Sequence, residues 1–373
     1  MNHKDNSDST DIGDYMKVFA CTAVMMQSVL SLVLTTDPDH NTQIIIGILY
    51  NFVKFTAPAF IFGILYTTTR TTNQNHWSNY DKFFRKHWSA LFVPTIWWTL
   101  TYLMIFPNVQ QVNHFNSFGS FIWQFINGNA APHLWYNTMM LQFILLMPFF
   151  WSLAHWVKNN IGHTIFTIMV TIIVFAIWIK FYDMQVFHGP HQQNWYLLDR
   201  FFFSFVIYGI FGVLAWMSRD KFEALIQKTL PISLILFCIS FYWTNKELFN
   251  FGYPIKLTNA PYYKFSMTLY SLIIISLIAA LAIYQLRKHS QTLPFFHFLA
   301  IYAYRAYLSN VFWLQIIWKL FGSTLSTANP LLAIISCYLL TWGLSFTSAY
   351  IFHVLWVKTK SIINKIGFRL PIE

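Results

Sequence analysis

Charged side chains inside apolar stretches are the first candidates for chemistry in this sequence. Lys54 lies midway along the apolar run 43–66, four residues before Pro58, and Arg305 lies about eight residues into the run 297–321. A charge at the centre of a membrane-spanning helix costs about 2.5–3.5 kcal/mol, so such groups usually face a bundle interior or a water-filled cavity. We therefore expect Lys54 and Arg305 to point inward, as functional or paired groups.

Asp199 and Arg200 stand together at the start of the apolar run 200–218. Charged residues at the end of such a run commonly anchor it at the membrane–water interface, with the charged group in water. We expect this pair to be an interfacial anchor.

Several histidines lie in outer or interfacial positions, and His114 and His133 are the candidates among them for activating an acceptor hydroxyl. Both could act as general bases near neutral pH. A single histidine at an interface is nevertheless more often a hydrogen-bonded anchor. The sequence contains no HExxH, GxSxG, GxGxxG or P-loop pattern, so none of these soluble-enzyme motifs accounts for it.

The composition predicts an all-α, polytopic integral membrane protein whose main partner is the lipid bilayer. Hydrophobic residues make up 56% of the 373 residues and charged residues only 10%, against about 25% charged in soluble domains. The net charge of +11 comes from short clusters between apolar runs, which argues against a nucleic-acid partner. The three cysteines all fall in apolar runs, so we expect no disulfide framework. We also expect no bound cofactor.

A transmembrane helix needs about 20 mostly apolar residues. Between a polar N-terminal segment (1–14) and a basic tail (357–373), the domain 15–356 contains ten such runs. They are 15–35, 43–66, 88–106, 134–156, 163–182, 200–218, 230–248, 264–286, 297–321 and 330–356.

The distribution of Lys and Arg predicts that both termini are cytoplasmic. Alternate connections, together with the two ends, hold 16 of the 24 basic residues, whereas the connection 107–133 has none. Cytoplasmic loops carry the excess of Lys and Arg. The first run has no cleavage site after it, so we expect it to be retained as a span. The absence of targeting signals favours a bacterial plasma membrane.

The order of these features resembles the membrane-bound acyltransferase-3 family, in particular its surface-polysaccharide branch, which includes the intercellular adhesin membrane protein. The most specific likeness is His133-Leu134-Trp135-Tyr136 at the entry to the fourth run. Further segments that resemble the family are Asp14–Lys17, Phe55–Phe62, Lys82–Lys86 with Pro94 behind it, Tyr208–Gly212 and Ala303–Leu308.

The sequence departs from the family at both of its usual histidines. Eleven residues after Lys17 stands Ser28, with Gln27 beside it, and Asn310 takes the place of the second histidine. On an ideal helix Arg305 and Asn310 lie about 140° apart, whereas Arg305 and Ser309 share a face.

The resemblance implies transfer of an acetyl or succinyl group from a cytoplasmic acyl-CoA to hydroxyls of a cell-surface glycan. The expected catalytic residues are His133, His114, Asn310 and Arg305. The expected substrate- or donor-binding residues are Lys17, Arg85, Lys86, Lys54 and Trp135. The clustered cations among them suit phosphate oxygens.

Two alternatives remain open. A chain without the family histidines could be a non-catalytic protein for polysaccharide export or assembly, working with polysaccharide synthase components. A secondary transporter is the last alternative, because no clear internal repeat is visible.

Overall fold

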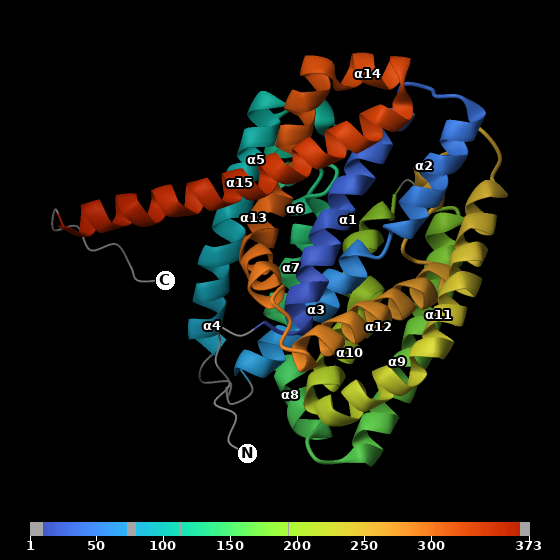
Figure 1. The fold of residues 1–373 in the computed structure, drawn as a ribbon, viewed down its shortest axis with the longest axis vertical. Coiled ribbons are helices and arrows are strands. Elements are labelled where there is room, and N and C mark those ends of the chain that lie inside the picture. Colours follow the sequence, from blue (N-terminus) through green and yellow to red (C-terminus); the bar gives the residue numbers. More distant parts are fainter. Residues whose placement is uncertain (1–9, 73–79, 112–113, 193, 366–373) are drawn as a thin grey trace.

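The computed structural model describes residues 10–72, 80–111, 114–192 and 194–365, and within these ranges it is helical, without β-strands (Figure 1). The helices are α1 Ile12–Leu34, α2 His40–Phe52, α3 Thr56–Thr72, α4 Tyr80–His87, α5 Val93–Ile105, α6 Phe118–Asn127, α7 Trp135–Leu145, α8 Met147–Val157, α9 Ile161–Tyr182, α10 Val206–Met217, α11 Arg219–Phe249, α12 Phe265–Arg287, α13 Leu293–Ile317, α14 Ser323–Ala328 and α15 Pro330–Lys365.

Seven helical segments of the described residues are long and apolar enough to cross a membrane, or eight if the bent pair α7–α8 forms one span. The predicted all-helical, multi-pass membrane class is therefore confirmed. Of the remaining predicted spans, 200–218 corresponds to a shorter apolar helix at Phe202–Met217, and 297–321 falls on α13, which is not among the candidate spans. The count of ten and the cytoplasmic termini stay predictions.

Lipid is the natural solvent for the outer helices. On α9 and α11 large apolar side chains are exposed along much of the helix, among them Ile165, Phe166, Ile177, Ile232 and Ile235. In water such a surface would be costly, whereas in a bilayer it is the surface that contacts hydrocarbon.

The predicted second span is one long helical run with a break in the middle. Helix α2 ends at Phe52 and α3 begins at Thr56, because Pro58 has no N–H to donate to the carbonyl of Lys54. Side chains bond two of the carbonyls at the break, as a membrane interior requires. Gln27 Nε2 donates to Val53 O at 2.7 Å, and the Tyr270 hydroxyl donates to Phe52 O at 2.7 Å.

A second break divides the predicted fourth span. Helices α7 and α8 meet at a 55° bend around Leu146, and Pro148 stands in the first turn of α8. As in the α2–α3 run, the proline cannot continue the hydrogen-bond ladder of the preceding helix.

Two connections predicted from the sequence are helical in the structure. The 107–133 segment contains α6, which has a capping box of Ser117 and Ser120 at its start and a left-handed Gly128 at its end, both common helix boundaries. The 219–229 segment is the first part of α11, because no glycine or proline interrupts it before Pro231 and Arg219 pairs with Glu223 one turn on. Pairs at this spacing support a helix.

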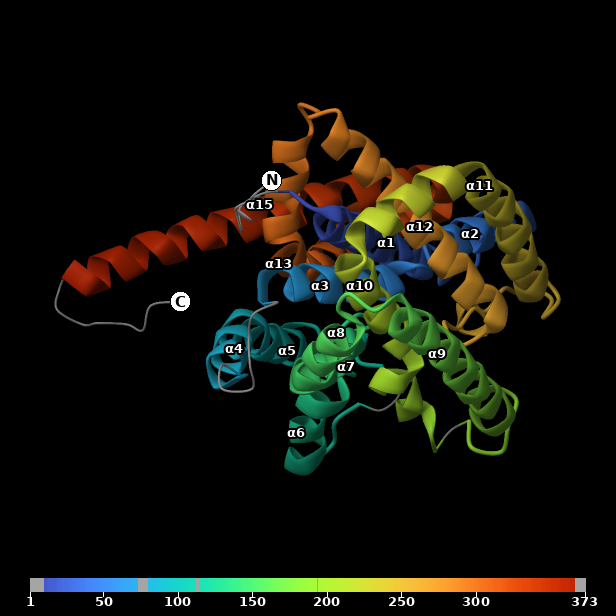
Figure 2. The ribbon, with the colours of Figure 1, turned by 90° about the horizontal axis from the view of Figure 1, so that it is seen from below.

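The centre of the bundle is formed by α1, α3, α10 and α13 (Figures 1 and 2). Glycines allow the closest approaches. A Cβ at Gly63 of α3 would lie 2.7 Å from Met16 Cβ, and one at Gly212 of α10 would lie 2.6 Å from Phe62 O. Small residues at such crossings let helix backbones pack tightly.

The predicted domain limits at the two chain ends stay predictions. Residues 1–9 and 366–373 lie outside the described residues, α1 begins at Ile12, and α15 continues to Lys365. Helix α15 leaves the bundle and projects beyond it (Figure 1).

Candidate functional site

A cavity of about 800 Å³ lies among the second half of α1, the α2–α3 break, the start of α7, the 255–263 segment and α13. We call it the central cavity; its volume falls in the range of about 300–1,000 Å³ usual for ligand sites. The lining residues that matter below are Gln27, Ser28, Lys54, His133, Trp135, Asp199 and Arg200. Segments far apart in the chain therefore meet at one site.

Lys54 lies in the α2–α3 break rather than in mid-helix. Its side chain is buried, and Nζ donates to the Tyr50 hydroxyl at 2.9 Å. The ammonium lies 4.6 Å and 4.4 Å from the ring centroids of Tyr50 and Tyr262. No carboxylate of the described chain lies within ion-pair distance of it, so aromatic faces and a phenol are its partners.

His133 lies just before α7, with its ring between those of Tyr102 and Tyr307, at centroid distances of 5.4 Å and 5.0 Å. Nε2 is 3.4 Å from the carbonyl of Leu308, which can only accept, so Nε2 carries the hydrogen. Nδ1 has no hydrogen-bond partner within the described ranges. Burial lowers the pKa of His133 to about 3, so its imidazole is neutral and a weak base.

The sequence predicted that Asp199 and Arg200 are interfacial anchors. They instead form part of the cavity wall. Arg200 is 5% exposed; its Nε contacts Asp199 Oδ1 at 3.2 Å, and Nη1 donates to Asn129 Oδ1 at 2.6 Å and to the carbonyl of Asn127. The irregular segment before α10 turns the pair inward, and periodicity carries no signal for such a segment.

The Asp199 carboxyl, which was not among the expected site residues, combines access to the cavity with a raised pKa. Its side chain keeps 30% of its surface exposed while it lines the cavity. Burial raises the pKa of Asp199 to about 6, although Arg200 and Lys54 partly offset that effect. A perturbed carboxyl in a cavity is a candidate general base. The sequence signal for it was the adjacent charge pair itself.

Gln27 and Ser28, at the position of the first family histidine, both line the central cavity. Gln27 is used structurally, since its amide bonds the Val53 carbonyl in the α2–α3 break. The Ser28 hydroxyl donates to Val24 O at 3.1 Å within its own helix. Neither side chain is an imidazole-like base here.

Three of the four expected catalytic residues do not line the central cavity. Asn310 is fully buried in α13, and its amide donates to the carbonyl of Tyr307. Arg305 is partly exposed on α13, and His114 is exposed before α6. Trp135, by contrast, lines the cavity as expected, with its ring 5.9 Å from that of Tyr262.

The cations expected to hold a donor lie at the opposite end of the bundle, near the start of α1 (Figure 1). Lys17 is paired with Asp14 at 3.2 Å. Arg85 and Lys86 are exposed on α4, and Arg85 pairs with Asp81 at 3.2 Å, with both side chains 80% exposed. Arg85 and Lys86 are thus accessible to an anionic ligand, because the Arg85–Asp81 pair is exposed, whereas Lys17 pairs with a buried carboxylate.

The described residues hold no group of three His, Cys, Asp or Glu side chains that could bind a metal ion. Comparison with protein families is decisive. An acyltransferase-3 family model, described as an acyltransferase domain, matches residues 13–350.

The chain belongs to this acyltransferase family. The match includes all residues that line the central cavity and the basic residues of α1 and α4. No curated protein and no solved structure matches the chain. The family and the apolar helices together make it a multi-pass membrane protein with an acyltransferase domain.

Proposed function

We propose that this protein transfers an acyl group, acetyl or succinyl, from acyl-CoA to a hydroxyl of a cell-surface glycan held in the central cavity. The observation that carries the proposal is the meeting of Asp199, Lys54 and His133 at one cavity in a member of an acyltransferase family. We place it in a bacterial plasma membrane, acting together with polysaccharide synthase components.

The proposed donor site lies at the start of α1 and on α4, where Arg85 and Lys86 would contact the phosphates of acyl-CoA. Cations with free donors suit phosphate oxygens. Lys17 and Gln27 are ten residues apart on α1, or about 15 Å along the helix axis. The arm of acyl-CoA between its phosphates and its thioester must span about this length for the acyl group to enter the central cavity.

In the proposed reaction the Asp199 carboxylate accepts the proton of the acceptor hydroxyl, and the oxygen attacks the thioester carbon. His133 Nδ1, which is free to accept, positions the hydroxyl. The Lys54 ammonium stabilises the oxyanion of the tetrahedral intermediate. The C–S bond then breaks, the proton passes to the leaving sulfur, and the products are an ester and free CoA thiol.

This role for Asp199 replaces the expectation that His133 is the base. A base is most effective when its pKa lies near the working pH, and the low pKa of His133 disfavours it. His114, Asn310 and Arg305 remain untested as catalytic residues, and we give them no step because they do not line the cavity.

The test is acyl transfer by purified protein in proteoliposomes. Radiolabelled acetyl-CoA or succinyl-CoA is supplied on one face, and a panel of soluble oligosaccharides on the other. Label appearing in ester linkage on a sugar, dependent on the protein, supports the proposal. No label with any donor, combined with loss of surface polysaccharide on gene deletion, would instead indicate the export or assembly role.

A further inference from the structure

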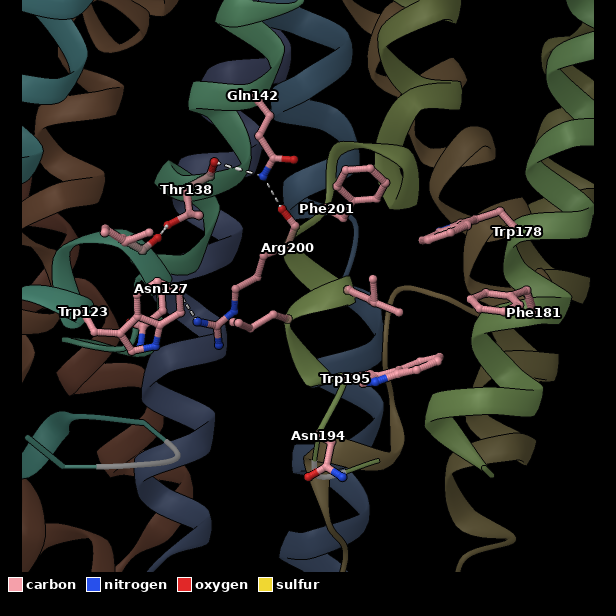
Figure 3. A pocket seen from close by; sticks show the side chains of 13 residues that line it. Trp123, Asn127, Thr138, Gln142, Trp178, Phe181, Asn194, Trp195, Arg200 and Phe201 are labelled. Carbon is pink, nitrogen blue, oxygen red and sulfur yellow. Dashed lines mark hydrogen bonds between the residues drawn. The ribbon is translucent and has the colours of Figure 1, made fainter. Parts of the chain in front are cut away.

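A second cavity, of about 580 Å³, adjoins the central cavity at Arg200, which lines both (Figure 3). We call it the lateral cavity. It lies among α6, α7, α9 and the 194–201 segment, and its aromatic lining consists of Trp123, Trp178, Phe181, Trp195 and Phe201.

The tryptophans of the lateral cavity combine open ring surface with free donors. Trp123 is 45% exposed and Trp195 41% exposed. Neither indole N–H donates to another described residue, whereas the indole N–H of Trp178 donates to Ser204 Oγ at 3.0 Å. An indole offers an apolar face and one polar edge, so it suits a ligand with both kinds of surface.

Asn127, Thr138 and Gln142 lie around Arg200, whereas Asn194 lies apart from them near Trp195 (Figure 3). Gln142 Nε2 donates to the Arg200 carbonyl at 2.7 Å, and Arg200 Nη1 donates to the carbonyl of Asn127. Asn127 is itself 4% exposed. Its Nδ2 and the side-chain amide of Asn194 make no hydrogen bond within the described ranges.

A sugar ring matches this lining better than a lipid chain. The C–H faces of a sugar pack on aromatic rings, and its hydroxyls can bond the free indole and amide groups. A hydrocarbon chain would shut these donors off from water without replacing their hydrogen bonds, which is costly.

We infer that the lateral cavity is a subsite for further sugar units of the acceptor, whose reacting hydroxyl lies beside Asp199 in the central cavity. This inference rests on the proposed function. Because Asp199 and Arg200 are consecutive residues, a chain of sugars that passes Arg200 enters the lateral cavity directly. The acceptor is therefore an oligomer, and binding improves with its length.

The direct test is calorimetric binding to the full-length protein in nanodiscs, which needs no catalysis. The probes are cellotetraose, chitotetraose and maltotetraose, each with its own monosaccharide. We expect at least one tetrasaccharide to bind about tenfold or more tightly than its monosaccharide, a difference of about 1.4 kcal/mol. Trp123→Ala and Trp195→Ala should remove most of that gain.

Two further variants make the test specific. Trp195→Phe keeps an aromatic face and should retain more of the length effect than Trp195→Ala. The matched control is Trp97→Ala on α5, since Trp97 is 64% exposed and lines neither cavity. Equal binding of tetrasaccharides and monosaccharides, or equal losses in the Trp97 and Trp195 variants, overturns the inference.

The remaining outcomes separate this inference from the proposed function. Length-dependent binding without acyl transfer supports the subsite and rejects the enzyme. Acyl transfer that is equally fast to monosaccharides and tetrasaccharides supports the enzyme and rejects the subsite. No binding of any tetrasaccharide rejects the subsite, and stronger fluorescence quenching by lipids brominated in their acyl chains in the wild type than in Trp123→Ala then shows that the lateral cavity takes lipid.

Discussion

Asp199 interacts with two of the three cationic side chains that line the central cavity, Arg200 and Lys54. Its carboxyl pairs with Arg200, and it is near enough to Lys54 for each charge to affect the other. The phenols of Tyr182 and Tyr263 also face it, and the Tyr263 hydroxyl donates to the Asp199 carbonyl at 2.6 Å. A change of protonation at this one residue therefore alters the charge of the whole cavity.

The proposed base predicts how the acyl-transfer rate depends on pH. With the pKa of Asp199 raised to about 6, the active carboxylate is lost as the pH falls through 6, to about one tenth at pH 5. Wild-type kcat should fall in parallel. Asp199→Asn should lower kcat by about 10²–10⁴-fold and abolish this fall of kcat at acidic pH, the acid limb of the pH profile.

Asp183→Asn is the matched control, since Asp183 lies at the same end of the bundle, is 47% exposed and does not line the cavity. An Asp199→Asn variant with a full rate, or one that keeps the wild-type pH limb, would contradict the assignment.

Lys54 supplies the second prediction at this scale. Lys54→Met keeps the apolar stem and removes the ammonium, so stabilisation of the oxyanion is lost. We expect kcat to fall by about 10²–10³-fold with a small change in KM for the acceptor. The measurement is steady-state kinetics on protein that elutes as wild type in size-exclusion chromatography.

Lys158→Met, a change at an exposed lysine in the α8–α9 connection, should leave the rate unchanged. Should the two methionine variants have equal rates, Lys54 has only a structural role.

Much of the residue-scale prediction rested on position within apolar runs. That reasoning placed Lys54 inward, because a lysine far from either end of a run has no easy route to water. It failed for Asp199 and Arg200, because a charge pair at the start of a run looks the same whether the chain there faces water or a cavity. Only the fold of the segment before α10 distinguishes the two.

At the scale of helices, the crossing of α3 and α10 depends on a missing side chain. A Cβ at Gly212 would lie 2.6 Å from the carbonyl oxygen of Phe62, which is closer than real Cβ contacts allow. Gly212→Val should therefore push α10 away from α3 and destabilise the protein by about 1–3 kcal/mol.

The measurement for this helix crossing is thermal unfolding in detergent, read by a thiol-reactive dye or by loss of the monodisperse peak. Gly343→Val on α15 is the matched control, because no atom of the described residues lies within 4 Å of a Cβ built there. A melting temperature equal to that of the control would show that α10 can shift at no cost.

The sequence predicted most of the helices because the length of an apolar run is a strong signal. It did not predict where those helices are interrupted. Pro58 and Pro148 were visible in the sequence, but a proline in a span kinks some helices and breaks others. Helix α6 was missed because a run of ten residues is shorter than a span, although its Ser117 cap and Gly128 were readable.

At the scale of the whole molecule, the membrane orientation is the open expectation. Cysteine labelling can test it in a Cys238→Ala background, since Cys238 is exposed and the other two cysteines are buried. In intact cells Gly119→Cys, at the start of α6, should react with an impermeant maleimide. Lys158→Cys should react only after permeabilisation.

The reverse pattern would place the central cavity on the cytoplasmic side and remove the glycan acceptor from the proposal. Labelling of both positions in intact cells would contradict the predicted alternation of spans between them.

The break between α2 and α3 has a consequence for biogenesis. Helix α2 has 13 residues and α3 has 17. They rise about 20 Å and about 26 Å, each short of a hydrocarbon layer of about 30 Å. Each half alone is too short to cross it, so we expect α2 and α3 to be integrated together as one span. The lysine at the break then enters the membrane with a helix on each side of it. Its charge is therefore never exposed to lipid on a short helix alone.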